Sequence, residues 1–283
     1  MVVDKPGDWT SHDVVARMRR LAGTRKVGHA GTLDPMATGV LVLGVNRATR
    51  LLGYVAGADK EYLATIELGA TTITDDAQGD EIDSTDASAV TADAVRAAML
   101  PLTGPIEQVP SAVSAIKVDG KRSYARVRSG ERVELKARPV EVATFELLSF
   151  EPGPRAHADV RVECSSGTYV RALARDLGAA LGVGGHLTSL RRTRVGRFGL
   201  DQARTLDQLG ENLEMVGLDD AARAAFPGHQ LTAEQARNVR FGRALSDVFL
   251  PAGGPVAMFD PDGAFLALYE LGGPGARPVA VFV

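Results

Sequence analysis

The sequence predicts an α+β protein with one large mixed domain and a small, mostly β domain after it. Capped segments with apolar residues at helical spacing predict helices at 12–22 and 92–100. Alternating or continuous apolar runs predict strands at 40–45, 61–68, 139–150 and 156–164. Pro227-Gly228 reads as a linker, and short strands are expected beyond it.

The first 110 residues are expected to alternate short strands and helices. Val2-Val3 opens a strand, Thr10 or Ser11 caps the helix at 12–22, and Thr91 caps the helix at 92–100. The remaining elements of this part are a short helix at 48–55, a loop over the acidic stretch 74–86, and a strand at 106–109.

Further along, strand patterns precede a second helical region. A strand at 111–118 leads to a turn at Asp119-Gly120 and a basic segment at 121–136 that contains Tyr124. The elements expected later are a helix beginning near Val170 with Thr168 as its cap, helical pieces at 205–209 and 213–225, a helix at 232–241, and strands at 255–259 and 265–269.

Composition sets limits on location and cofactors. With 283 residues the chain can bury a substantial core. Its single cysteine, Cys164, excludes an internal disulfide and fits a reducing cytoplasm. There is no signal-peptide pattern and no uncharged apolar run of about 18 residues, so we expect a cytoplasmic protein with no membrane span. Five scattered histidines give no zinc-site spacing, and no Rossmann or Walker motif is found, so we expect neither metal nor cofactor.

The net charge of −3 is unevenly distributed along the chain. Acidic residues collect at 75–86, whereas basic residues collect at 117–138 and again at Arg191, Arg192, Arg194 and Arg197. A basic face is compatible with binding to a phosphate backbone. The alternative is that these side chains are simply solvated.

The loop at 27–39 holds one acid, Asp34, among three glycines and a proline. Glycine lets the backbone approach a ligand closely, and the apolar run after the loop predicts a buried strand. Asp34 is therefore placed as a nucleophile would be, at the edge of a core. An ordinary Asp-Pro turn remains the alternative.

A second informative stretch, at 164–178, places Arg171 in the first turn of a helix. The helix dipole disfavours a cation at that end, so Arg171 is expected to have a carboxylate partner. The alternative is an arginine that reaches solvent.

Gly-His-Ala-Gly-Thr-Leu-Asp-Pro at 28–35 and Gly-Thr-Tyr-Val-Arg at 167–171 resemble the motifs of the TruB family of tRNA pseudouridine synthases. The resemblance implies the pseudouridine synthase fold, a mixed, mainly antiparallel sheet flanked by helices. It implies that Asp34 is the catalytic aspartate and that Arg171 pairs with it. It also implies that Tyr62, in Lys60-Glu61-Tyr62, stacks on the target base.

The same resemblance implies a substrate and a division of the chain. The substrate is tRNA, bound by its T-arm and modified at position 55 of the T-loop by a monomeric enzyme. Residues 1–226 form the catalytic domain with a basic RNA-gripping insertion at about 117–138, and residues 229–283 form a PUA-like RNA-binding domain. The substrate-binding residues implied are His29, Lys5, Lys60, Tyr169 and Leu190.

Several alternatives stay open at this point. The chain could be a tRNA-binding folding aid without catalysis, although binding alone needs no buried acid. It could be a carboxylate glycosidase, but that chemistry needs a second carboxylate about 5–10 Å away, and the loop supplies only Asp34. For the isomerisation itself, Asp34 could attack the ribose C1′ or the pyrimidine C6, or assist formation of a glycal. Tyr62 could act as a base as well as a stacking partner.

Overall fold

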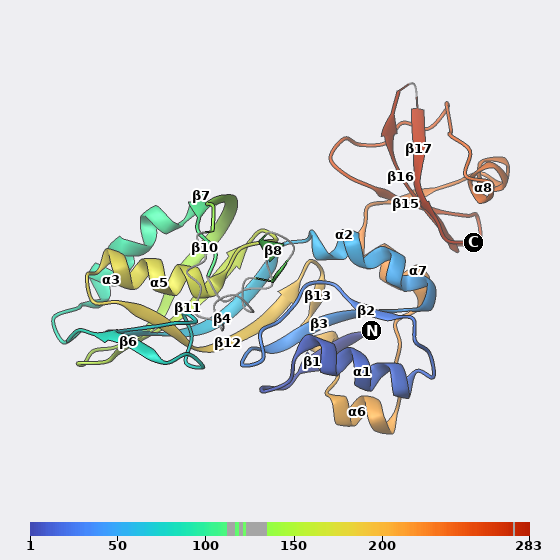
Figure 1. The fold of residues 1–283 in the computed structure, drawn as a ribbon. Coiled ribbons are helices and arrows are strands. Elements are labelled where there is room, and N and C mark those ends of the chain that lie inside the picture. Colours follow the sequence, from blue (N-terminus) through green and yellow to red (C-terminus); the bar gives the residue numbers. More distant parts are fainter. Residues whose placement is uncertain (112–116, 119–120, 123–134, 274) are drawn as a thin grey trace.

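The computed structural model describes residues 1–111, 117–118, 121–122, 135–273 and 275–283 (Figure 1). Most of the strand expected at 111–118 and of the basic segment at 121–136, including Tyr124, lies outside these ranges.

The larger sheet of the described chain is mixed and mainly antiparallel. Its strand order is β1-β3-β12-β4-β11-β10-β7, with β2 paired to β3 and β13 paired to β12. The β3–β12 pair is parallel. The strands are β1 (Val2–Lys5), β2 (Val27–His29), β3 (Thr38–Val45), β4 (Lys60–Leu68), β7 (Gly104–Gln108), β10 (Arg138–Glu151), β11 (Ala156–Cys164), β12 (Gly185–Val195) and β13 (Phe198–Gly199). This architecture confirms the predicted α+β class.

Helices and one small hairpin accompany this sheet. The helices are α1 (Ser11–Leu21), η1 (Asn46–Leu51), α2 (Leu52–Ala56), α3 (Ala92–Met99), η2 (Leu100–Leu102), α5 (Val170–Ala180), η3 (Leu200–Gln202), α6 (Leu206–Glu211) and α7 (Leu218–Ala225). The hairpin pairs β5 (Ala70–Thr72) with β6 (Glu81–Ser84), and another short pair joins β8 (Lys117–Val118) to β9 (Lys121–Arg122).

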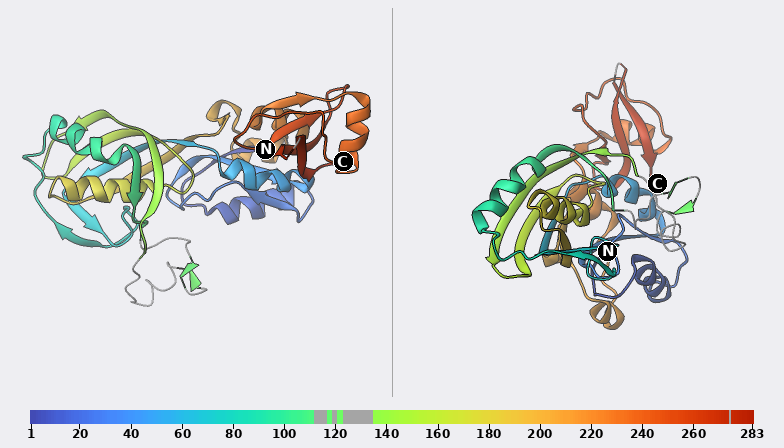
Figure 2. Two further views of the ribbon diagram at one scale, coloured as in Figure 1. Left: turned by 90° about the horizontal axis from the view of Figure 1, so that it is seen from above. Right: turned by 60° about the vertical axis from the view of Figure 1, so that its left-hand side comes forward.

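A second sheet lies at one end of the elongated molecule (Figures 1 and 2). Its order is β14-β15-β16-β17, and helix α8 (Ala233–Arg240) packs against it. The strands are β14 (Gly228–Gln230), β15 (Val256–Phe259), β16 (Phe265–Gly272) and β17 (Gly275–Val281). The sequence patterns did not predict strand β17.

The two sheets are joined by direct contacts between η1 and the last strand. Arg47 and Arg50 donate to the carbonyls of Phe282 and Val281, and the Arg50 guanidinium lies 4.7 Å from the centre of the Phe282 ring. Leu51 is buried in a cluster that includes Phe259 and other residues of the small sheet. The small sheet therefore packs onto the larger unit through η1.

The sequence pattern accounts for the elements that support the site. Thr10 and Asp13 form a capping box at the start of α1, and this helix buries its apolar side at Val14, Val15 and Met18. Strand β4 alternates, so Tyr62 points to the same inner face as Ala64, Ile66 and Leu68. Tyr62 therefore faces the core side of the sheet.

Three local expectations were wrong. The acidic stretch 74–86 is not all loop, because β6 lies within it and pairs with β5. Gly228 is not a linker residue, because it begins β14, which pairs in parallel with β15. Thr168 does not cap α5: the helix has Tyr169 at its N-cap without a side-chain bond, while the Thr168 hydroxyl donates to the Ser165 carbonyl instead.

Candidate active site

The loop that carries Asp34 connects β2 to β3 and is fixed to the neighbouring strand β12. Gly31 and Gly39 have φ values of 89° and 99°, a conformation that favours glycine. A Cβ on Gly39 would lie 2.1 Å from the carbonyl oxygen of Arg192. The loop therefore meets β12 backbone to backbone at a distance only glycine allows.

Two buried polar side chains hold the loop from below. The Ser11 hydroxyl accepts from the Leu33 backbone N–H and donates to the Leu33 carbonyl. The Lys5 ammonium donates to the carbonyls of Pro6, Trp9 and Pro35 at 2.7, 2.7 and 3.1 Å. Lys5 is fully buried, and burial lowers its pKa to about 8. The ammonium thus lies under the loop, where it contacts three backbone carbonyls.

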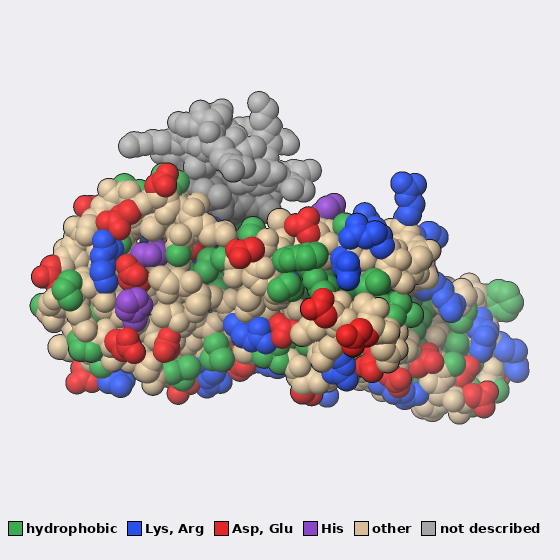
Figure 3. All heavy atoms as spheres, turned by 90° about the horizontal axis from the view of Figure 1, so that it is seen from below, with side chains coloured by type: hydrophobic (Ala, Val, Ile, Leu, Met, Phe, Trp, Pro, Cys, Tyr) green, Lys and Arg blue, Asp and Glu red, His purple; other side chains and the backbone are tan. Residues whose placement is uncertain are grey.

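Arg192 holds the loop from the side of the sheet. Its guanidinium donates to the carbonyls of Gly31, Thr32 and Val40, and its side chain is buried. The basic run at 191–197 therefore does not form a uniformly exposed patch, because Arg192 is buried and two of its neighbours pair with acids. Arg191 pairs with Asp4 at 2.7 Å, and Arg194 pairs with Glu163. The face shown in Figure 3 likewise has acidic and basic side chains interspersed.

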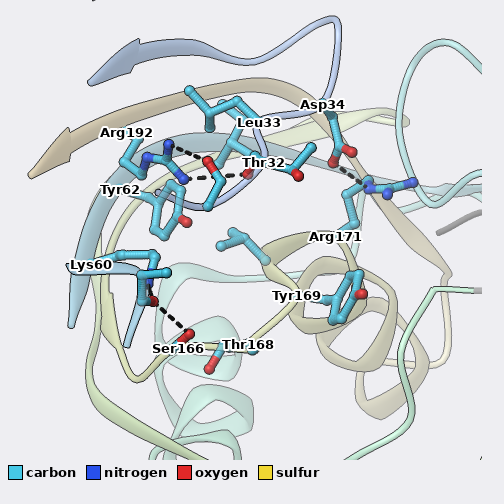
Figure 4. A pocket seen from close by; sticks show the side chains of 15 residues that line it. Thr32, Leu33, Asp34, Lys60, Tyr62, Ser166, Thr168, Tyr169, Arg171 and Arg192 are labelled. Carbon is cyan, nitrogen blue, oxygen red and sulfur yellow. Dashed lines mark hydrogen bonds and ion pairs between the residues drawn. The ribbon is translucent and has the colours of Figure 1, made fainter. Parts of the chain in front are cut away.

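Asp34 meets Arg171 at the mouth of a cavity (Figure 4). The Nε of Arg171 lies 3.0 Å from Oδ2 of Asp34. The arginine side chain is 6% exposed and the aspartate side chain 37% exposed. The predicted ion pair is thus present, and the carboxylate remains open to the cavity while its partner is buried.

Arg171 also contacts a second carboxylate, which the sequence did not single out. Its Nη1 lies 3.3 Å from Oδ2 of Asp76 and donates to the Thr74 carbonyl at 2.8 Å. Oδ1 of Asp76 accepts from the Thr74 hydroxyl and from the Gln78 N–H. Asp76 is buried, so this acid fixes the arginine rather than facing the cavity.

The cavity has a volume of about 280 Å³. Its lining comes from the Asp34 loop, from β4, from the start of α5 and from β12, and includes Asp34, Tyr62, Tyr169, Arg171 and Leu190. Figure 4 shows Tyr62 and Asp34 on neighbouring sides of this space. Burial raises the pKa of Tyr62, which keeps the phenol protonated at neutral pH.

The other predicted contact residues lie in different positions. Lys60 lines the cavity, but its buried ammonium donates to the carbonyls of Ala56 and Ala58, and burial lowers its pKa to about 8. His29 lies on β2 and is not among the described residues that line the cavity. Burial lowers the pKa of His29, which favours the neutral imidazole.

Polar side chains that the sequence reasoning missed also shape the site. Gln108 on β7 binds both the N–H and the carbonyl of Tyr169, which fixes the start of α5. Ser166 donates to the Ala56 carbonyl across the cavity wall. Contacts between residues more than 60 positions apart have no signal in local sequence patterns.

No described helix is both long and apolar enough to cross a membrane. Within the same residues, no group of three or more His, Cys, Asp or Glu side chains is arranged to hold a metal ion.

Family models match the whole length from residue 19 onward. The N-terminal domain of TruB family pseudouridylate synthases matches residues 19–170. The C-terminal domain of tRNA pseudouridylate synthase B matches residues 171–253, and the C-terminal model of tRNA pseudouridine synthase II matches residues 226–283. The chain belongs to the TruB family of pseudouridylate synthases.

Relatives with this family's name are similar over the full chain. The tRNA pseudouridine synthase B of Arthrobacter sp. (strain FB24) is 59% identical, with 100% of this chain and 95% of that protein covered. The Mycobacterium leprae protein of the same name is 55% identical, with coverage of 99% and 89%. This TruB-family chain is therefore an isomerase, so the binding-only and glycosidase alternatives no longer apply.

Solved structures show the same fold. A chain in a Cbf5-Nop10-Gar1 complex has a TM-score of 0.75 and 26% identity, covering 100% of this chain and 84% of that one. A chain in an H/ACA RNP bound to a substrate RNA containing 2′-deoxyuridine has a TM-score of 0.74 at the same identity and coverage. The expected pseudouridine synthase fold is thus confirmed.

Proposed function

We propose that this enzyme converts the uridine at position 55 in the T-loop of tRNA to pseudouridine, with Asp34 as the catalytic carboxylate. The observation that carries the proposal is the ion pair of Asp34 with buried Arg171 at the mouth of the cavity. The names of the full-length relatives support tRNA as the substrate. We place the reaction in the cytoplasm, with the enzyme acting as a monomer.

The reaction requires one bond to break and another to form. The N1–C1′ bond of the nucleoside breaks, the base turns, and a C5–C1′ bond forms while the C5 proton leaves and N1 gains a proton. Because these atoms are inaccessible in a stacked loop, the nucleotide must be extruded into a pocket. A cavity of about 280 Å³ is of the size that a single nucleoside can enter.

We assign the attack to Asp34. Its side chain is partly exposed to the cavity, whereas the arginine that holds it is buried. A carboxylate nucleophile must be held in a fixed orientation toward the reacting atom, and the contact with Nε of Arg171 at 3.0 Å provides this. Attack at C1′, attack at C6 and assistance to a glycal all begin from the carboxylate held in this way.

Tyr62 and Leu190 are proposed to hold the extruded base. Both line the cavity, and an aromatic ring suits stacking on an unpaired base. The raised pKa of Tyr62 argues against its action as a general base, because a phenol that keeps its proton cannot accept another one. Tyr169, which also lines the cavity, is proposed to contact the same nucleotide.

The remaining assignments concern Lys5, Lys60, His29 and the two parts of the chain. Lys5 and Lys60 support the walls through backbone carbonyls, and we assign them positioning roles. His29 is proposed to contact the RNA next to the extruded nucleotide. Residues 1–226 act as the catalytic domain with a basic insertion at 117–138, and residues 229–283 act as a PUA-like RNA-binding domain.

The test is tritium release from tRNA that carries 5-tritiated uridine. Wild-type enzyme should release tritium because the C5–H bond is lost, and Asp34→Asn should release none while still binding tRNA. A transcript with cytidine at position 55 is the matched substrate control. Tritium release that persists from this transcript would contradict the assignment of the reaction to position 55. Turnover by Asp34→Asn would show that Asp34 is not the catalytic carboxylate.

A further inference from the structure

The segment between β5 and β6 presents two consecutive carboxylates to one face of α5. Asp76 pairs with Arg171 at 3.3 Å, and Asp75 pairs with Arg175 at 3.3 Å. Residues four apart on a helix lie one above the other on the same face. Each acid therefore meets its own arginine on successive turns of α5.

The backbone at Asp75 adopts a conformation that residues other than glycine rarely take. Its φ is 59°, in the left-handed region, where Asp and Asn are tolerated better than most residues. Strand β12 fixes this conformation, because Leu187 donates to the Asp75 carbonyl at 3.1 Å and accepts from the Ala77 N–H at 2.8 Å. An unfavourable backbone geometry persists only where the surrounding structure fixes it, and β12 does so here in the turn that contacts Arg171.

Arg175 also ties this turn to the chain just beyond β7. Its Nη2 donates to the Val109 carbonyl at 2.8 Å, just beyond the end of β7, and lies 2.8 Å from Oδ1 of Asp176. Its side chain is 28% exposed and that of Asp75 is 14% exposed. Neither side chain is among the described residues that line the cavity, so their effect on substrate must be indirect.

We propose that the Asp75–Arg175 ion pair positions Arg171, and through it Asp34. This inference rests on the proposed function, in which Asp34 is the catalytic carboxylate. The pair clamps the turn against α5, and the turn supplies both the Asp76 carboxylate and the Thr74 carbonyl that hold Nη1 of Arg171. When the clamp is lost, the turn moves away from α5 and the guanidinium that faces Asp34 loses its fixed orientation.

Four variants of the full chain test this positioning role. Asp75→Asn keeps the size and the tolerance of left-handed φ but removes the charge, and Arg175→Gln removes the other partner. Each should lower the single-turnover rate of pseudouridine formation about tenfold at saturating tRNA, because small misplacements at a reacting group have large effects on rate. The Kd for tRNA should not change. Arg175→Lys, which keeps the charge, should recover part of the rate, and Asp75→Ala, which also disfavours φ near 59°, should lose more.

The matched control is Arg204→Gln, which removes another partly exposed arginine that pairs with an acid, Glu214, at 3.0 Å. This variant should keep the wild-type rate. Thermal unfolding of every variant shows whether it folds. Combining Asp75→Asn with Asp76→Asn should give a rate loss smaller than the product of the two single losses, since both act through Arg171.

A measurement that does not depend on turnover separates this inference from the proposed function. The ¹H–¹⁵N resonance of the Arg171 Nε, assigned by its absence in Arg171→Lys, should shift in Asp75→Asn and stay in place in Arg204→Gln. An unchanged resonance and an unchanged rate in Asp75→Asn would overturn the positioning role, as would fully multiplicative losses with Asp76→Asn. A wild-type enzyme that releases no tritium would instead contradict the proposed function.

Discussion

The Nε of Arg171 lies 3.0 Å from Oδ2 of Asp34, and Nη1 of the same guanidinium lies 3.3 Å from Oδ2 of Asp76. One buried arginine therefore divides its donors between an acid that is open to the cavity and an acid that is closed from it. A planar guanidinium can make both contacts at fixed angles, whereas a lysine ammonium is a single point charge.

The first prediction concerns this geometry. Arg171→Lys should keep the positive charge but lose one of the two carboxylate contacts, so we expect a fall in the single-turnover rate of about a hundredfold. Binding of tRNA should be little affected, because the guanidinium is buried. Quench-flow measurement of pseudouridine formation, with filter binding as the companion assay, gives both values. A lysine variant with wild-type rate would show that charge alone is sufficient.

A second prediction separates the ring of Tyr62 from its hydroxyl. Tyr62→Phe keeps the aromatic surface and should retain most of the turnover if stacking is the role. Tyr62→Ala should weaken binding of the extruded base by about 1–3 kcal/mol, the usual contribution of a stacked aromatic ring. Single-turnover kinetics on T-arm RNA measure this loss. If Tyr62→Phe is as inactive as Tyr62→Ala, the hydroxyl and not the ring carries the function.

A third prediction follows from the pKa of Lys5, which burial lowers from 10.5 to about 8. Below about pH 8, Lys5 carries its proton in both the folded and the unfolded chain. The full cost of burying its charge therefore lowers the free energy of unfolding in this range. Between about pH 8 and 10.5 the folded chain releases the proton first, so this group's contribution to stability rises with pH.

The activity should change in the opposite direction. A neutral amine has two N–H donors for the three carbonyls of Pro6, Trp9 and Pro35, so loop order should decrease as Lys5 deprotonates. In denaturant unfolding from about pH 7 to 10, the free energy of unfolding of the wild type should rise relative to that of Lys5→Met. Turnover by the wild type should fall above about pH 8. If the stability difference between these two proteins is independent of pH, Lys5 does not titrate in this range.

Local patterns predicted most of the fold, but they left an ordinary turn open for Asp34 and a solvent-exposed side chain open for Arg171. The alternation at 61–68 predicted strand β4, and an arginine at the unfavourable end of α5 indicated a carboxylate partner. Both features are properties of a single segment. The motif resemblance then joined Asp34 and Arg171 across 137 positions, a pairing that spacing alone could not select.

The parts that the sequence did not predict depend on contacts between distant segments. Asp76 belongs to an acidic stretch that resembles a solvated loop, and only its approach to α5 makes it a buried partner of Arg171. Arg192 belongs to a basic run that resembles a surface patch, yet β12 turns it inward onto three carbonyls. A run of like charges predicts that its side chains are exposed, and this prediction fails where a distant segment, such as α5 or the Asp34 loop, supplies a partner.

The last prediction concerns Gly39, where the Asp34 loop enters β3. Its φ of 99° disfavours any side chain, and a Cβ would lie 2.1 Å from the Arg192 carbonyl oxygen and 2.9 Å from its carbonyl carbon. Gly39→Ala must therefore push β3 away from β12, the strand whose Arg192 holds the loop at Gly31 and Thr32. We expect a loss of about 2 kcal/mol or more in the free energy of unfolding together with a large loss of turnover.

Gly53 is the matched control, because it lies in α2 with no positive φ and with no heavy atom within 4 Å of the position that an added Cβ would take. Gly53→Ala should be neutral or slightly stabilising, since alanine is favoured over glycine in helices by about 1 kcal/mol. Denaturant unfolding and tritium release on both variants compare the same added methyl group at two sites. Equal stability of the two variants would mean that β3 and β12 can separate at Gly39 without cost, and the close backbone contact would then not be what holds the Asp34 loop.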